Sequence, residues 1–163
     1  MRFEARSMAV ALIAMSGPGF AQDADDGAVG TLRVPALVRR AADKAAPGAK
    51  LAKAAVEVKD DGRMLYKLVG IDAKDREIEV EVTDQGHVLA VETRISMRQV
   101  PKPVIEALRL KTRGLKLDKA ESVTRGGHIL GYEFEGQNDD GNDVEVNVSR
   151  DGTTVRVDVF DKE

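Results

Sequence analysis

The chain contains no cysteine, no tryptophan and few aromatic residues, 4% in all. Without cysteine it has no disulfides, no thiolate zinc site and no cysteine nucleophile. A core with so few aromatic rings has to be built from Val, Leu, Ile and Ala. No apolar run of about 20 residues is present, so no conventional membrane-spanning helix is expected. The formal net charge of −3 over 163 residues gives no basic footprint for nucleic acid or an anionic membrane.

The N-terminal segment from Met1 to Ala21 has the order of a secretory signal. Two arginines in MRFEARS precede the short apolar run MAVALIAM, and SGPGFA ends in the small-x-small pattern Gly19-Phe20-Ala21. This order predicts cleavage after Ala21, followed by a flexible, acidic leader at residues 22–33. The alternative is a surface helix, because the apolar run is near the minimum length and Glu4 is unusual in a signal. Export predicts a periplasmic or secreted protein.

The rest of the chain is an internal repeat, in which one segment occurs twice without a gap and at a constant spacing. YKLVGIDAKDREIEVEVTDQGHVLAV, from Tyr66, pairs with YEFEGQNDDGNDVEVNVSRDGTTVRV, from Tyr132. At the same spacing, VPALVRRAADKAAPGAKLAKA, from Val34, pairs with VPKPVIEALRLKTRGLKLDKA, from Val100. The match predicts two repeats, residues 34–96 and 97–163. Only SMRQ separates the last strand of the first repeat from Val100, so the two units have to touch.

Each repeat predicts one helix followed by four strands. Pro35 and Pro101 fit the first turn of a helix, and Gly48 and Gly114 are stop signals. Alternating runs follow, separated by turns rich in Gly, Asp and Asn, and consecutive strands joined by such turns are antiparallel. The strands are expected at residues 51–59, 63–71, 76–83, 87–95, 118–125, 128–136, 142–149 and 153–160.

The alternation assigns the two faces of the predicted sheet. One face is apolar and has to be covered by the helices. We therefore expect an α+β fold, in which two tandem α-β-β-β-β repeats form one antiparallel sheet with two helices on one face, sharing a core. The apolar face comprises Met64, Tyr66, Leu68, Ile78, Val80, Val82, Leu89, Val91, Ile95, Leu130, Tyr132, Phe134, Val144, Val146, Val148, Val155, Val157 and Val159.

This pattern resembles the tandem form of the PepSY-like domain, related to beta-lactamase-inhibitor-like proteins. The resemblance is carried by the helix that starts at Pro35 and ends at Pro47-Gly48, by Tyr66, and by the segments at 79–82 and 84–86. The second repeat has most of these features but lacks the Pro-Gly helix end. The resemblance implies an exported, non-enzymatic binding domain that uses an exposed sheet face. Its implied partner is another extracytoplasmic protein, such as a peptidase that it inhibits or regulates.

The charged face of the sheet is the candidate site, either as a simple solvated face or as a recognition surface. Catalysis is disfavoured, because paired carboxylates do acid–base work only where burial splits their pKa values, and an open face would leave them hydrated. The alternative function is binding of cations or small charged ligands through the acidic turns and this glutamate-rich face. The predicted partner-binding residues are Lys67, Glu79, Glu81, Glu133, Glu135, Glu145, Arg156 and Asp158.

Other candidate sites are weak. His87 and His128 are expected to be exposed at strand starts, because neither has a nucleophile signature nearby. The acidic loop GQNDDGND fails the EF-hand pattern, since placing Gly141 at position 6 puts Gly136 and Asn147 where carboxylates belong. We expect a hairpin loop there. The sequence predicts no enzyme, no cofactor and no metal ligand set, and it does not set the oligomeric state.

Overall fold

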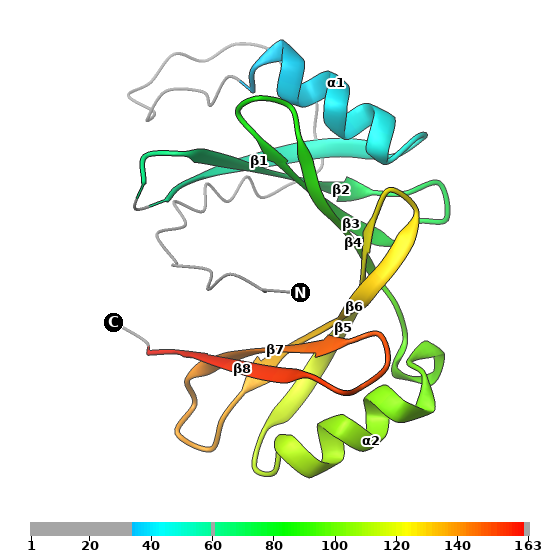
Figure 1. Ribbon diagram of the computed structural model, residues 1–163, viewed down its shortest axis with the longest axis vertical. Helices are drawn as coiled ribbons and strands as arrows, with labels where there is room; N and C mark the ends of the chain where they lie inside the picture. The colour runs from blue at the N-terminus through cyan, green and yellow to red at the C-terminus, as the bar shows by residue number, and fades with distance from the viewer. Residues whose placement is uncertain (1–33, 60, 162–163) are drawn as a thin grey trace, which may run out of the picture.

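The computed structural model describes residues 34–59 and 61–161, so the predicted signal peptide and leader lie outside the described residues. The element order is one helix and four strands, twice, with a short 3₁₀ helix (η1) between the repeats (Figure 1). The first repeat contains α1 (Ala36–Ala45), β1 (Lys50–Val58), β2 (Met64–Ile71), β3 (Glu77–Thr83) and β4 (Val88–Arg94). After η1 (Met97–Gln99), the second repeat contains α2 (Lys102–Lys111), β5 (Lys116–Arg125), β6 (His128–Gln137), β7 (Asp143–Ser149) and β8 (Val155–Phe160).

The eight strands form a single antiparallel sheet in chain order, β1 to β8. The two repeats meet where β4 pairs with β5, from Val91 opposite Thr124 to Arg94 opposite Glu121. The predicted α+β fold with one continuous sheet is therefore confirmed, and each strand begins and ends within two residues of its predicted bounds. In the connection, the side chains of Ser96 and Gln99 form a capping box around η1.

Both helices lie on the same side of the sheet, which is its convex side, because the sheet curves away from them (Figure 1). Pro35 and Pro101 stand immediately before the first helical residues, as N-caps, one position earlier than a first-turn proline. Each helix buries a stripe at spacings of three and four residues. The buried positions are Val38 and Ala42 in α1 and Val104, Ala107 and Leu108 in α2.

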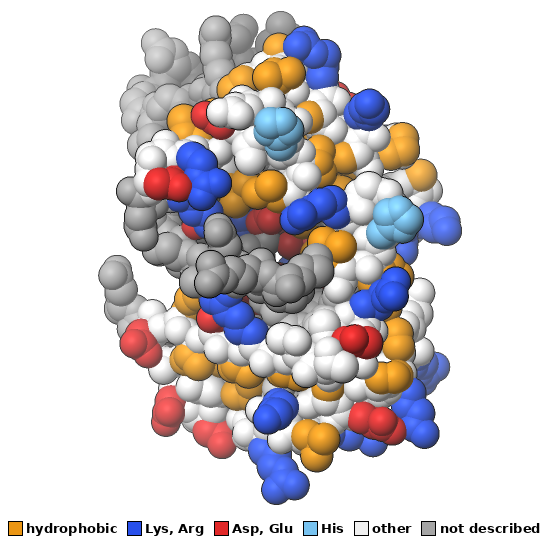
Figure 2. Space-filling model, viewed as in Figure 1, with side chains coloured by type: hydrophobic (Ala, Val, Ile, Leu, Met, Phe, Trp, Pro, Cys, Tyr) orange, Lys and Arg blue, Asp and Glu red, His pale blue; other side chains and the backbone are white. Residues whose placement is uncertain are grey.

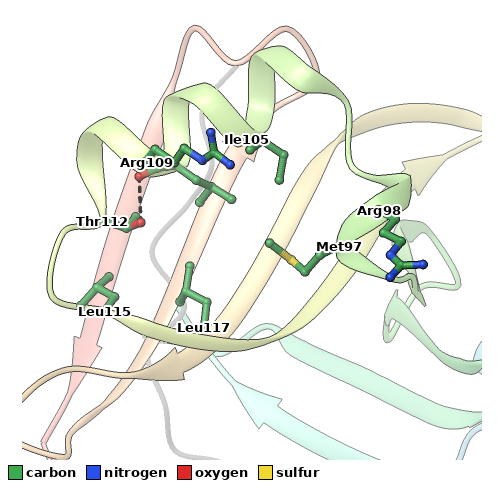
Figure 3. Close-up of a pocket in the computed structure, with 8 residues that line it drawn as sticks. Met97, Arg98, Ile105, Arg109, Thr112, Leu115 and Leu117 are labelled. Carbon is green, nitrogen blue, oxygen red and sulfur yellow. Dashed lines mark hydrogen bonds between the residues drawn. The ribbon is translucent and has the colours of Figure 1, made fainter.

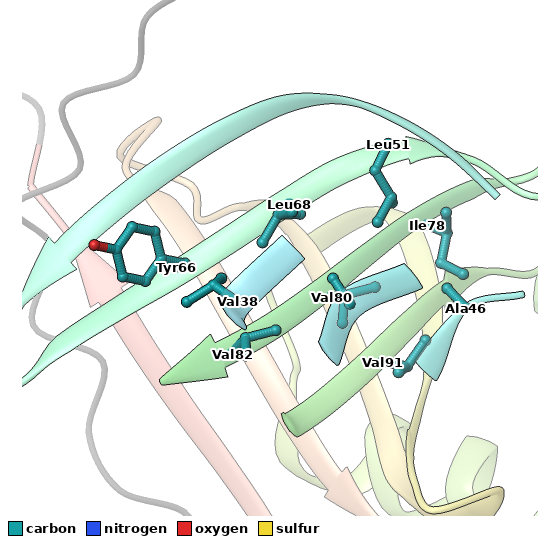
Figure 4. Close-up of a cluster of buried hydrophobic side chains, with 10 residues drawn as sticks. Val38, Ala46, Leu51, Tyr66, Leu68, Ile78, Val80, Val82 and Val91 are labelled. Atoms are coloured by element: carbon teal, nitrogen blue, oxygen red, sulfur yellow. The ribbon is translucent and has the colours of Figure 1, made fainter. Parts of the chain in front are cut away.

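The apolar side chains form two clusters, one under each helix, and this corrects the expected shared core. In the first cluster Val38 of α1 packs with strand residues such as Leu68 and Val80 (Figure 4). The second cluster is built around Phe134 and Val104. Ile95, at the end of the first repeat, packs against this second cluster, so the two cores are linked through the junction.

The predicted face assignment is wrong at one position, and three other positions lie on the predicted face but are exposed. A β-bulge in the β3–β4 ladder, between Glu81 and Val82, shifts the alternation, so that Val88 packs against the core in place of Leu89. Met64, at the first position of β2, is 36% exposed. In the edge strand β8, Val157 and Val159 are 37% and 51% exposed. A single ten-residue helix covers only part of a four-stranded face, so the margins of the sheet remain accessible.

Candidate binding surface

The predicted binding residues all lie on the face of the sheet opposite the helices. Successive residues of a strand point to opposite faces, so these residues alternate with core positions such as Val80 and Val146. On the concave side of a curved sheet, their side chains converge from neighbouring strands. Lys67 lies on β2, Glu79 and Glu81 on β3, Glu133 and Glu135 on β6, Glu145 on β7, and Arg156 and Asp158 on β8.

The structure adds residues from β1, β4 and β5 to this face, which we call the concave face. Glu57, Glu92, Lys119 and Glu121 were not among the predicted site residues. In β1 and β5 the inward positions are often alanine, as at Ala54 and Ala120, which weakens the apolar signal of the alternation. The register of the β5–β6 pair places Lys119 and Glu121 on this face, because they stand opposite Glu135 and Glu133.

Two lysines each bridge a pair of carboxylates on the concave face. The Nζ atom of Lys67 lies 3.5 Å from Glu79 Oε1 and 3.6 Å from Glu81 Oε1, both on the next strand. The Nζ atom of Lys119 lies 3.1 Å from Glu121 Oε2, on its own strand, and 3.0 Å from Glu135 Oε1, on the next. Each lysine therefore lies within ion-pair distance of two acidic side chains, although Glu79 Oε1 is buried without a hydrogen-bond partner.

Three carboxylates meet at the junction of the repeats. Glu92 of β4, Glu121 of β5 and Glu133 of β6 each offer an oxygen within 4.8 Å of the others, an arrangement that could hold a metal ion. All three are buried, as is Glu81, so the expected open and hydrated face is wrong at its centre. Burial raises the pKa of Glu121, while Lys119 opposes that rise and the charges of Glu135 and Glu77 add to it.

The concave face has an excess of negative charge. Carboxylates directly opposite one another, such as Glu79 with Glu92 and Glu121 with Glu133, are unfavourable cross-strand neighbours unless cations lie close by. The carboxylates of the face include Glu57, Glu77, Glu79, Glu81, Glu92, Glu121, Glu133, Glu135, Glu145 and Asp158, and its cations include Lys53, Lys67, Arg94, Lys119 and Arg156. A complementary binding partner would be basic.

The histidines and the acidic loop behave as expected. His87 and His128 are exposed at hairpins, and both histidines are visible at the surface in Figure 2, where acidic and basic side chains are interspersed. In the β6–β7 loop, Asn138 Oδ1 accepts hydrogen bonds from the backbone N–H groups of Asp140 (3.0 Å) and Asn142 (2.9 Å). Gly141 completes the turn with a φ of 82°. The loop is a hairpin connection closed by its own side chain.

Comparison with known proteins identifies the fold but no family. No family model matches the chain, and no curated protein matches it. A solved structure of a BLIP-like protein from Bacteroides fragilis superposes with a TM-score of 0.58 at 19% identity, covering 82% of this chain and 92% of that one. A DUF2874 family protein from Bacteroides uniformis gives 0.58 at 18% identity, with 78% and 90% covered.

A third solved structure, from Bacteroides eggerthii, gives a TM-score of 0.58 at 16% identity and covers 78% of this chain and 89% of that one. At these identities the likeness establishes a BLIP-like fold, and the finer PepSY-like assignment stays a prediction. In residues 34–59 and 61–161 no helix is long and apolar enough to cross a membrane.

Proposed function

We propose that the chain is an exported, non-enzymatic binding module that holds another extracytoplasmic protein against the concave face of its sheet. The observation that carries this proposal is one continuous face, drawn from all eight strands, on which carboxylates and a few cations are held in place by ion pairs. The BLIP-like neighbour and the Bacteroides eggerthii protein, described as a candidate periplasmic protein, support an extracytoplasmic location.

The size of the face favours a protein as the partner. Eight strands have seven intervals of about 4.8 Å, so the sheet extends about 34 Å, and a seven-residue strand is about 23 Å long. The product is close to the roughly 800 Å² that each partner contributes to a standard protein–protein interface. Small-molecule sites are instead enclosed hollows. The doubled repeat thus serves a surface, because one unit alone would supply half this area.

The chemistry of the face favours a basic surface on the partner. Lysine or arginine side chains of the partner would meet the carboxylates of β3 to β7, and such complementarity raises association rates and specificity. A module of this kind acts by occupying a surface of its target. Inhibition or regulation of a secreted or periplasmic enzyme, such as a peptidase, is the form of action that we propose.

The test is capture of a partner by the chain from Gln22 onward, used as bait in an extracytoplasmic extract. Glu135→Lys with Asp158→Lys reverses two charges on the concave face. The matched control, Asp43→Lys with Glu106→Lys, reverses two exposed charges on the helices. We expect the partner to be captured by the wild type and the helix variant and lost from the concave variant. Equal capture by both variants would place the interface elsewhere.

A second candidate function, cation binding, is favoured by the close approach of Glu92, Glu121 and Glu133. Carboxylate oxygens are the ligands that calcium prefers, although its sites hold six to eight oxygens. Calorimetric titration with calcium and zinc distinguishes this candidate from a purely protein-binding module. A saturable heat of binding that disappears in Glu121→Gln supports a cation site. If neither calcium nor zinc gives a heat of binding, this candidate function is excluded.

A further inference from the structure

A hollow of about 540 Å³ lies beside helix α2, on the side of the molecule away from the concave face. Figure 3 shows side chains from three elements around one space: Ile105 and Arg109 from α2, Met97 from η1 and Leu117 from β5. Thr112 and Leu115, in the turn after α2, close one end. The volume lies within the range of about 300–1,000 Å³ that is usual for small-molecule sites.

The lining combines an aliphatic floor with two cationic groups. The floor comes from Met97, Ile105, Leu108, Leu115 and Leu117, and the cations are Arg98 and Arg109. The Thr112 hydroxyl, the one neutral polar side chain in the lining, already donates to the Leu108 carbonyl at 2.8 Å. The lining contains no carboxylate, amide or histidine side chain.

The two arginines are available to a ligand. Within the part of the chain that the structure describes, neither Arg98 nor Arg109 has a hydrogen-bonded or ion-paired partner. Glu106, the acidic residue on α2, is exposed and forms a 3.7 Å pair with Lys102. A guanidinium binds a carboxylate through two parallel hydrogen bonds, which is one of the stronger polar contacts in proteins.

The first repeat has no equivalent of this chemistry, so the fold does not require it. In the alignment of the two repeats, Arg109 corresponds to Asp43, which pairs with Arg39 at 3.2 Å. The floor residues Leu108 and Leu115 correspond to alanines at 42 and 49. At these three aligned positions, the large aliphatic residues and the guanidinium therefore occur only in the second repeat.

We propose that this hollow binds a small anionic amphiphile, a carboxylate that carries an aliphatic chain. The aliphatic floor takes the chain, and the guanidinium of Arg109, beside Ile105, binds the carboxylate at the rim (Figure 3). A peptide fits less well, because its backbone N–H groups need acceptors that the lining side chains do not supply. The site is separate from the concave face, so its occupancy does not depend on the proposed protein partner.

The test is a calorimetric titration of the chain from Gln22 onward with octanoate, decanoate and dodecanoate below their micelle concentrations. Burial of each CH₂ contributes about 0.8 kcal/mol, so affinity should rise about fourfold per methylene until the hollow is filled. Dodecylammonium has the same chain with the opposite charge, and we expect it to bind at least tenfold more weakly than dodecanoate.

Variants separate this site from general surface adsorption. The double variant Arg98→Gln with Arg109→Gln removes both cations of the lining and should weaken the binding of dodecanoate at least tenfold. Arg40→Gln, at an exposed position on α1, should leave the affinity for dodecanoate unchanged. Methyl NMR signals of Ile105 and Leu115 should shift on saturation. The proposal is overturned if dodecanoate does not bind, if dodecylammonium binds equally well, or if the double variant binds as tightly as Arg40→Gln. Unchanged melting temperatures in both variants show that folding is not the cause.

Discussion

A Cβ atom on Gly136 would overlap the carbonyl oxygen of Lys116, on the neighbouring strand. The same relationship holds between Gly70 and Lys50 in the first repeat. Both contacts accompany β-bulges, one between Leu117 and Lys119 and one at the corresponding place in β1. Each glycine therefore lets the bulged strand approach its neighbour, and the repeated glycines maintain the same bend in both halves of the sheet.

We expect Gly136→Ala to destabilise the fold by about 3 kcal/mol, because the added methyl would overlap backbone atoms that cannot rotate away. The control is Gly126→Ala, at a left-handed turn position with no atom within 4 Å of the added methyl. It should cost only the backbone strain of about 1–2 kcal/mol. Urea unfolding of both variants measures the difference. Equal losses would mean that the β5–β6 bulge adjusts freely.

The internal repeat made most of this fold predictable. An ungapped match between the two copies, with a turn signal after every alternating run, located all eight strands and placed residues such as Val80 and Val146 in the core. The bulge at Glu81 and Val82 could not be predicted, because a single extra residue reverses the faces beyond it and leaves no local mark. As a result, Val88 packs against the core at the place expected for Leu89.

The candidate site was harder to predict than the core. Charged residues on the concave face were recognisable by period, but their grouping depends on which strands pair. Glu92 and Glu121 belong to different repeats and meet only through the β4–β5 ladder. Alternation assigns these carboxylates to a face of the sheet but does not show that they are buried. The hollow beside α2 needs three elements in contact, and its lining residues read in the sequence as ordinary helix and strand positions.

Helix coverage can be tested with one substitution made at two places. Val146 and Val157 are cross-strand partners on the same face, but Val146 is fully buried and Val157 is 37% exposed. Val146→Asp would place a carboxylate in the core and should cost several kcal/mol of unfolding free energy. Val157→Asp, at the open margin, should cost about 1 kcal/mol. Equal decreases in melting temperature for the two variants would contradict the observation that the helix covers Val146 but not Val157.

The β7–β8 turn should contribute a pH-dependent part of the stability. Asp151 accepts hydrogen bonds from the Ser149 hydroxyl (2.7 Å) and from the backbone N–H (3.1 Å) and hydroxyl (2.8 Å) of Thr153. These bonds lower the pKa of Asp151 from 3.8 to about 2, with the Ser149 hydroxyl as the largest cause. A carboxyl group whose pKa is lower in the folded state stabilises the fold above pH 3.8, and this stabilisation is lost as the pH falls towards 2.

Asp151→Asn keeps an acceptor oxygen but cannot titrate. The wild type should therefore lose more unfolding free energy than Asp151→Asn between pH 4 and pH 2, as measured by urea denaturation at a series of pH values. Ser149→Ala, which removes the largest cause of the lowered pKa, should show an intermediate slope. Parallel pH profiles for all three proteins would show that the pKa of Asp151 is the same in the folded and unfolded states.

The last prediction concerns how strongly the two repeats are coupled. Two separate cores favour independent unfolding, whereas the β4–β5 ladder favours a single transition. The ladder pairs four residues on each strand, and the Thr124 hydroxyl adds a 3.1 Å bond to the Val91 carbonyl. Hydrogen bonds contribute about 1 kcal/mol each and burial of Ile95 in the second core about 2 kcal/mol, so these contacts couple the two repeats.

The hydrophobic core of a unit of about 60 residues rarely supplies more than about 3–5 kcal/mol, so loss of the coupling between the repeats removes most of the stability of an isolated half. We therefore expect the chain from Val34 onward to unfold in one calorimetric transition. Residues 34–96 expressed alone would expose the pairing groups of β4 as a free edge, and should be unfolded or self-associated in sedimentation velocity. A monomeric 34–96 fragment with a sharp melt of its own would show that the repeats are independent units joined only by the ladder.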